Sequence, residues 1–203
     1  ETERLAISIT QEFPRHLFSW KVLGALLKQM GKKAEAINAY EKVIEISPQD
    51  AEAHSNLGVM LQELGRLEEA EASYTQAITL KPDYFEVHYN LGVTLQELGK
   101  LDEAQASYTQ AIRFKPDYPD AHYNLGYTLK ELGRLEAAEA SYKQAIALNP
   151  FYAEAHYNLG ITLQELRRLD EAEASFRQAI AFKPDYAEAH SNLGVMLQEL
   201  GRL

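Results

Sequence analysis

The stretch AEAHSNLGVMLQELGRLEEAEASYTQAITLKPDY, residues 51–84, recurs along the chain with few changes. Six prolines mark its period, because each stands 34 residues after the one before it: Pro14, Pro48, Pro82, Pro116, Pro150 and Pro184. A fixed period of this length is typical of repeat proteins. With proline as position 32, the complete units are 17–50, 51–84, 85–118, 119–152 and 153–186, and half units fill 1–16 and 187–203. We therefore expect a single repeat array over residues 1–203, without linkers.

Each unit is predicted to form two helices. The first covers positions 1–14 and ends before a glycine at position 15, the usual residue after a helix end. The second runs from about position 18 to 31, where proline stops it. Small residues recur at position 8 (Gly) and position 20 (Ala), which predicts that the two helices approach closely there. Arg167 replaces the glycine of position 15 in one unit, and a left-handed arginine costs about 1 kcal/mol relative to glycine.

The composition excludes several classes of function. The 203 residues include no cysteine, which rules out disulfides and thiolate chemistry, and the net charge of −10 argues against nucleic acid or an anionic membrane as the main partner. No apolar run is long enough to span a bilayer. The beginning, ETERLAISI, has neither an initiator Met nor a signal-peptide layout, and the end, ELGRL, elsewhere leads into another helix. We interpret the chain as a fragment of a longer protein and expect a cytoplasmic location.

The repeat resembles the tetratricopeptide repeat (TPR) over the entire chain. The residues that carry this resemblance are Trp20, Leu23, Gly24, Leu27, Ala36, Tyr40 and Pro48 in the first complete unit, followed by the more regular units. The resemblance implies an all-α fold, a right-handed α-solenoid of helix-turn-helix repeats whose concave surface is lined by the first helices. It also implies a protein that binds peptides or proteins and is not itself an enzyme.

An asparagine recurs at position 6 of the first helix: Asn56, Asn90, Asn124, Asn158 and Asn192. At 100° per residue, positions 4, 7, 8, 11 and 14 form the packed stripe, and positions 2, 5, 6, 9, 12 and 13 lie opposite it. The asparagines should form a ladder in the groove, interrupted by Val22, where each amide can donate to and accept from an extended peptide backbone. Alternatively, each asparagine bonds within its own repeat or faces water. The repeats of O-GlcNAc transferase carry a similar asparagine, which implies contact with substrate backbone.

Four tyrosines share the predicted groove face: Tyr89, Tyr123 and Tyr157 at position 5, and Tyr127 at position 9. Because tyrosine is favoured at interfaces, they are candidates for a binding hot spot. The alternative is that each ring lies flat on the next helix. Acidic residues at positions 2 and 13 flank the ladder, and Lys130, which interrupts them, is also placed among the candidate binding residues. We expect an extended ligand of neutral or basic character.

The remaining motifs give no support for catalysis, a cofactor or a metal. A histidine recurs at position 4 (His54, His88, His122, His156 and His190), but neighbours about 10 Å apart cannot share an ion whose bonds to nitrogen are about 2 Å long. We interpret these histidines as partly buried structural residues. The sequence contains no GxGxxG, P-loop or GxSxG motif. Lys21 and Asn56 match part of the carboxylate-clamp pattern, but Glu86 and Asn90 stand where it needs basic residues.

Two further hypotheses remain open. The array could be the substrate-recruiting arm of a larger enzyme similar to O-GlcNAc transferase. The two half units could also complete each other between chains, giving head-to-tail self-association that need not close.

Overall fold

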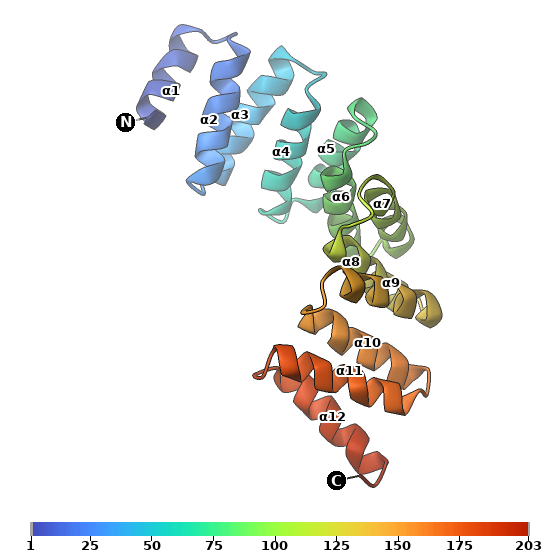
Figure 1. Cartoon of the computed structure of the whole chain (residues 1–203). Helices are drawn as coiled ribbons and strands as arrows, with labels where there is room; N and C mark the ends of the chain where they lie inside the picture. The colour runs from blue at the N-terminus through green and yellow to red at the C-terminus, as the bar shows by residue number, and fades with distance from the viewer. Residues whose placement is uncertain (1, 203) are drawn as a thin grey trace. The chain divides into compact units, whose positions relative to one another are not determined.

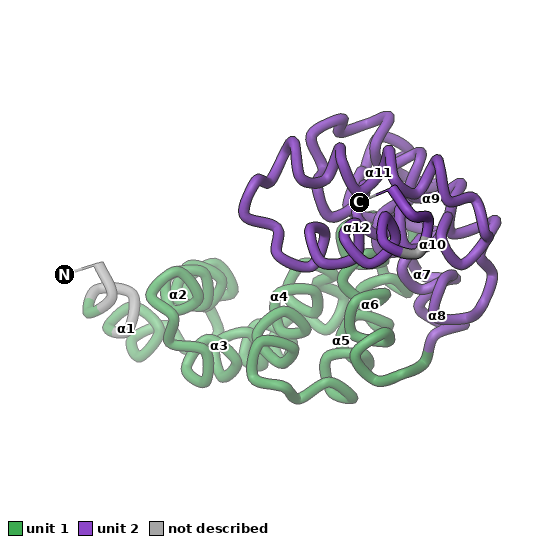
Figure 2. The backbone as a smooth tube through the Cα atoms, turned by 90° about the horizontal axis from the view of Figure 1, so that it is seen from below, with its two compact units in different colours: residues 1–100 green, residues 101–203 purple. Residues whose placement is uncertain are grey.

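The computed structural model describes residues 2–202 and, within that range, all side chains except those of residues 2, 3, 5–7 and 199. Its secondary structure consists of twelve α-helices, and the described residues contain no β-strand. The chain divides into two compact units, residues 1–100 and 101–203, and each is considered by itself (Figure 2). The expected all-α fold class is confirmed, whereas the single array over 1–203 stays a prediction.

The helices follow one another as alternating first and second helices of the repeats (Figure 1). Unit 1 contains α1 (Thr2–Glu12), α2 (Leu17–Gln29), α3 (Lys33–Ile46), α4 (Ala51–Gln62), α5 (Leu67–Leu80) and α6 (Phe85–Glu97). Unit 2 contains α7 (Leu101–Phe114), α8 (Pro119–Glu131), α9 (Leu135–Leu148), α10 (Ala153–Glu165), α11 (Leu169–Phe182) and α12 (Ala187–Glu199). Within each unit every helix packs on the next one in the chain. The even-numbered helices are the first helices of the repeats.

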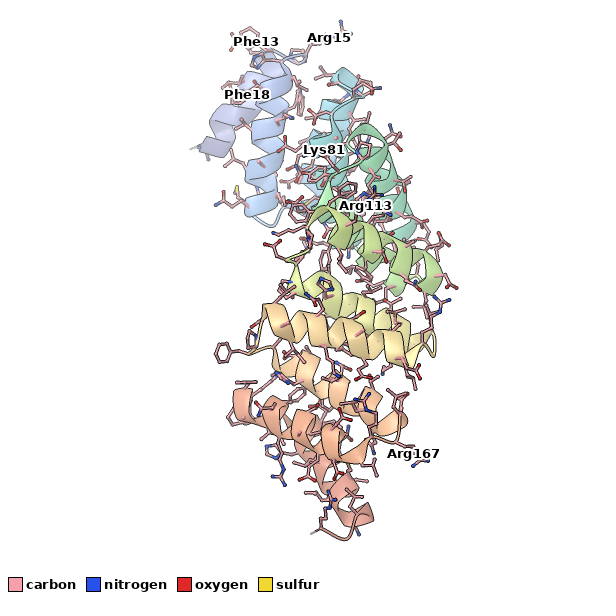
Figure 3. The ribbon with its side chains drawn as sticks, turned by 45° about the vertical axis from the view of Figure 1, so that its right-hand side comes forward. Phe13, Arg15, Phe18, Lys81, Arg113 and Arg167 are labelled. Carbon is pink, nitrogen blue, oxygen red and sulfur yellow. The ribbon has the colours of Figure 1, made fainter. Side chains whose placement is uncertain are left out.

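The turn between the two helices of a repeat has the same form in both units. Gly65, at position 15, has a φ of 72°, and the next backbone N–H, of Arg66, donates to the carbonyl of Leu61 at 2.9 Å. Arg167 has a φ of 62°, and the N–H of Arg168 donates to Leu163 at the same distance. The exposed side chain of Arg167 points away from the helices (Figure 3). The backbone is therefore left-handed at position 15 even where the residue is arginine.

The glycine at position 8 is a packing residue, as predicted, but the group that it accommodates is different. A Cβ on Gly58 would lie 2.6 Å from the ring of Tyr74, and one on Gly160 would lie 2.7 Å from the ring of Phe176. Both rings belong to position 24 and are fully buried. The alanines of position 20 are fully buried as well, but the aromatic ring fills the space over the glycine. The sequence pattern predicted only the alanine of position 20 as the neighbour of this glycine. The pattern shows where small residues recur, but not which side chain fills the space beside them.

Candidate peptide-binding face

The first helices are more deeply packed than a helical wheel predicts. Position 3 (Ala53, Val87, Ala121, Ala155 and Ala189) and position 10 (Met60, Thr94, Thr128, Thr162 and Met196) are the most buried, at 0–1% exposure. Position 14 was predicted to be packed, and Leu200 does pack against the core, but Leu64 is 46% exposed because it follows the end of α4. A first helix packs against its own second helix and against the second helix of the preceding repeat, so its buried side is broad. Position 6 lies at the border of that side.

In unit 2 two of the asparagines at position 6, Asn158 and Asn192, bond to the tyrosines of position 5 in the preceding repeat. The Nδ2 of Asn158 on α10 donates to the hydroxyl of Tyr123 on α8, and the Nδ2 of Asn192 on α12 donates to that of Tyr157 on α10, both at 3.0 Å. The Nδ2 of Asn158 also donates to the carbonyl of Glu154 at 3.0 Å. Both amide hydrogens of Asn158 are thus used, while its Oδ1 keeps acceptor capacity. We call these two links the Tyr–Asn pairs.

The tyrosine rings of these pairs rest on the link at the end of their own repeat. The centroid of the Tyr123 ring lies 5.0 Å from that of Tyr152, and the centroid of the Tyr157 ring lies 4.8 Å from that of Tyr186. Burial, and then the nearby Glu154 carboxylate, raise the pKa of Tyr123 above its ordinary value. Its hydroxyl therefore stays protonated at neutral pH, and the proton can be donated to a further acceptor.

In unit 1 the position-6 asparagine Asn56 has a charged partner. The Nζ of Lys28 on α2 donates to Oδ1 of Asn56 on α4 at 3.0 Å. Lys21 occupies position 5, where unit 2 has tyrosine, and its Nζ lies 2.8 Å from the carboxylate of Asp50 and 3.1 Å from that of Glu52. The hydrogen bond to Asp50 is the main cause that raises the pKa of Lys21. Asn56 thus uses its oxygen and keeps its amide hydrogens, the reverse of Asn158.

Tyr127 and Lys130 lie one turn apart on α8. The Nζ of Lys130 is 3.4 Å from the carboxylate of Glu131 and 5.6 Å from the centre of the Tyr127 ring. Tyr89 and Asn90 are half-buried on α6, and Asn124 is half-buried on α8.

Lys130 also changes the surroundings of a buried tyrosine. In the repeat 51–84 the position-12 residue is Gln62, whose Oε1 accepts a hydrogen bond from the hydroxyl of Tyr74 at 3.0 Å. Lysine has no acceptor. The corresponding hydroxyl of Tyr142 is buried and has no hydrogen-bonding partner among the described residues. This effect was not predicted from the sequence, although the contrast between Gln62 and Lys130 at one position is visible there.

Acidic residues at position 2 of unit 2 are engaged by the link between repeats. The carboxylate of Glu154 lies 3.1 Å from the Nζ of Lys183, and Oδ1 of Asp120 accepts from the hydroxyl of Tyr152 at 3.0 Å. Lys183 offsets the negative charge of Glu154, whereas the neutral hydroxyl of Tyr152 leaves the charge of Asp120 in place. At Glu154 the face is therefore less acidic than a count of its carboxylates indicates.

The histidines of position 4 hold the backbone of the link. In every case Nε2 lies 2.9–3.0 Å from the carbonyl oxygen of the proline six residues earlier, for example from His88 to Pro82. Trp20 makes the same bond, from Nε1 to the carbonyl of Pro14 at 2.9 Å. The N–H donates, so each histidine carries its proton on Nε2. These bonds agree with a structural role, although His190 is exposed and not partly buried as predicted. The described residues contain no group of three His, Cys, Asp or Glu side chains that could hold a metal ion.

The repeats match known family models along most of the chain. Sequence models of the TPR repeat match residues 24–65, 60–99, 95–133 and 126–167, and a model of the tetratricopeptide repeat matches 153–186. The chain belongs to the tetratricopeptide repeat family. No curated protein sequence matches it. Within residues 2–202, no helix combines the length and apolar character needed to cross a bilayer.

Solved structures share the fold. YrrB, described as a TPR protein with an unusual peptide-binding site, has a TM-score of 0.82 at 21% identity, over 92% of this chain and 96% of its own. MamA has a TM-score of 0.78 at 25% identity, over 82% of this chain and 97% of its own. MamA from Desulfovibrio magneticus RS-1 has a TM-score of 0.79 at 19% identity, over 84% and 97%. None of the three is O-GlcNAc transferase, so that closer resemblance stays a prediction.

Proposed function

We propose that the chain is a non-catalytic module that binds an extended peptide or protein segment along its first helices. The observation that carries this proposal is the presence of equivalent Tyr–Asn pairs in successive repeats of unit 2. Each pair joins two residues that the sequence predicts on the binding face. YrrB, which shares the fold, is described as having a peptide-binding site, and this gives further support for the same class of ligand.

The Tyr–Asn pairs can bind a peptide backbone because each pair still has a hydrogen-bond donor and an acceptor available. In the Tyr123–Asn158 pair the amide hydrogens are used, so the asparagine offers an acceptor, Oδ1, and the tyrosine offers its hydroxyl proton. A backbone presents the complementary N–H and C=O groups in every residue except proline. Neighbouring first helices lie about 10 Å apart and an extended chain rises about 3.3 Å per residue. One pair should therefore meet roughly every third residue of the ligand.

The finer assignment extends to the other candidate residues. Asn56, Asn90 and Asn124 continue the ladder, Tyr89 and Tyr127 add aromatic surface, and Lys130 adds a cation. The ligand should be neutral or basic, because its backbone is bound among carboxylates.

The test is a peptide-display selection against the whole chain, followed by binding measurements on the hits. We expect the double variant Tyr123→Phe/Tyr157→Phe to bind about tenfold more weakly, since each lost hydrogen bond contributes about 0.5–1.5 kcal/mol. Tyr142→Phe is the matched control, because it removes a buried tyrosine hydroxyl that bonds to nothing among the described residues. Hits that bind the double variant as tightly as the unaltered chain would contradict the proposal.

A further inference from the structure

The link between α1 and α2 differs in chemistry from the other links between repeats. Its position 33 is Arg15, and the second helix that follows, α3, carries Lys42 at position 26. Every other complete repeat has glutamine at position 26. In a chain of net charge −10, two cations thus stand around one link, where the other repeats have uncharged or acidic residues. At position 33 the other links carry Gln49, Asp83, Asp117, Phe151 and Asp185.

A cavity of about 430 Å³ opens beside this link, next to the C-terminal end of α3. The volume lies in the range of pockets that hold ligands, about 300–1,000 Å³. The indole of Trp20 forms a fixed wall, because its Nε1 donates to the carbonyl of Pro14 at 2.9 Å and its ring packs against the core of unit 1. This wall is therefore formed before a ligand binds. The lining residues are Pro14, Arg15, Trp20, Lys42, Glu45 and Ile46.

Arg15 is the cation of this cavity that is available to a ligand. Lys42 is not, because its Nζ pairs with the carboxylate of Glu45, and this hydrogen bond is the main cause that lowers the pKa of Glu45. The side chain of Arg15 is exposed and forms no hydrogen bond or ion pair with another described residue. Figure 3 shows it pointing away from the helices. A carboxylate of a ligand can therefore bind its guanidinium.

Two exposed phenylalanines lie at the same link. Phe13 is 54% exposed and Phe18 is 68% exposed, and Figure 3 shows both at the end of α2 that the link joins. Phe18 stands at position 2, where every other repeat has glutamate or aspartate. Exposed apolar side chains that gather in one place mark an interaction site. The surroundings of the cavity thus combine aromatic surface with an available cation.

The exposure of these side chains follows from their positions in the repeat and not from the place where the sequence begins. In the repeat 51–84 the first helix, α4, packs against both α3 and α5. The same positions are exposed around the helices of that repeat. What distinguishes the link between α1 and α2 is therefore the residues that it carries. The exposed equivalents are Gln49 at position 33, Glu52 at position 2, Gln76 at position 26 and Lys81 at position 31.

We propose that this cavity binds a short extended peptide segment in which an apolar side chain is flanked by one or two carboxylates. The apolar side chain contacts Trp20 and Ile46 in the cavity, and a flanking carboxylate pairs with Arg15. The neighbouring part of the segment rests on Phe13 and Phe18. A basic segment is disfavoured, because its cations face Arg15. The site belongs to unit 1, is separate from the Tyr–Asn pairs and does not rest on their function.

A single strand of nucleic acid is the poorer occupant. Its affinity comes mainly from lysine and arginine side chains that neutralise several phosphates. Among the lining residues of this cavity one cation is available, and the chain as a whole has a net charge of −10. A peptide segment with one or two carboxylates needs no further cation.

The probe for the test is a labelled peptide of sequence Gly-Ser-Glu-Phe-Glu-Ser-Gly, and its binding to the full chain is measured by fluorescence anisotropy. We expect saturable binding. Two matched peptides should bind at least tenfold more weakly: one with serine in place of the phenylalanine, which lacks the apolar side chain, and one with lysine in place of both glutamates, which reverses the charge. A labelled short oligothymidylate should bind more weakly than the acidic peptide.

Two variants of the chain test the cavity itself. Arg15→Asp introduces the residue that three other links carry, and Trp20→His introduces the residue of all other repeats at position 4, which keeps the bond to the proline carbonyl. Each should lose at least tenfold in affinity for the acidic peptide, with a nearly unchanged melting temperature for Arg15→Asp. Lys33→Gln is the matched control, because it removes one positive charge at the opposite end of α3, and it should bind as the unaltered chain does.

No saturable binding of the acidic peptide, or equal affinity in Arg15→Asp, would overturn the proposal. An equal loss in Lys33→Gln would overturn the assignment to this cavity, since it would show a general attraction of charge. Tighter binding of the oligothymidylate, or a dimer of the unaltered chain that Arg15→Asp abolishes, would overturn the assignment to a peptide. Tyr123→Phe/Tyr157→Phe should bind the acidic peptide unchanged, which separates this site from the Tyr–Asn pairs.

Discussion

Helices α4 and α12 have the same sequence, yet their asparagines do opposite things. Asn56 in unit 1 accepts a hydrogen bond from Lys28 through its oxygen, whereas Asn192 in unit 2 donates one to Tyr157 through its nitrogen. The preceding repeat decides between the two: in unit 1 its position 12 is Lys28, which donates to Asn56, and its position 5 is Lys21, which is bound by carboxylates. In unit 2 its position 5 is Tyr157, which accepts from Asn192. The repeat therefore fixes where the amide lies, while its neighbour decides what the amide offers to a ligand.

The glycines of the two helices differ in the same way. Gly58 lies under the ring of Tyr74, and Gly194 is open. Packing against Tyr74 therefore requires glycine at position 58. The described surroundings of Gly194 do not require glycine there.

The largest expected effect comes from placing alanine at both glycines. Gly58→Ala should lower the free energy of unfolding by about 1–3 kcal/mol, because its methyl group overpacks a fully buried ring. Gly194→Ala should raise it by about 0.5–1 kcal/mol, because alanine is the better helix former. Thermal or urea unfolding of the two variants measures the difference. Equal effects on both would show that the ring of Tyr74 has room to move and that the two glycines are equivalent.

A smaller effect is expected at position 15, where Arg167 replaces glycine and the backbone conformation stays the same. Arg167 has the same left-handed conformation as Gly65, and Arg167→Gly should stabilise the chain by about 1 kcal/mol. For a chain of this length that corresponds to a rise in melting temperature of about 2–4 °C. Gly133→Arg, at the same position of the preceding repeat, is the matched control and should produce the reverse shift. A lower melting temperature for Arg167→Gly would mean that the arginine side chain stabilises the fold by more than the left-handed backbone destabilises it.

The smallest effects concern the partners of the two asparagines. Tyr157→Phe should destabilise unit 2 by about 1 kcal/mol, because a half-buried amide loses its acceptor. Lys28→Met should cost about 0.5 kcal/mol or less, since a flexible lysine gains little from a partly exposed bond. Double-mutant cycles with Asn192→Ala and Asn56→Ala isolate the two bonds. A coupling energy at Asn56 that equals or exceeds the one at Asn192 would contradict the contrast between the units.

For the candidate binding face, the sequence predicted which residues recur on the first helices, but not how deeply they are buried or what they bond to. A helical wheel places Asn158 opposite the packed stripe, yet its side chain is only 8% exposed, because the packed side extends to positions 3 and 10. The wheel considers one helix at a time. It has no information on the second helix of the preceding repeat, which buries those two positions.

The sequence by itself determined the features that depend on neighbours within one repeat. These features are the 34-residue period, the helix ends, the left-handed residue at position 15 and the structural histidines. They follow from local rules, because the hydrogen bonds that define them join residues at most six apart, as from His88 to Pro82. The tertiary structure alone decided which atoms meet between repeats. Asn158 and Tyr123 are 35 residues apart, and Gly58 and Tyr74 meet only after two helices have closed. Such contacts depend on the packing of whole helices, so identical segments can bury different surfaces and present different groups.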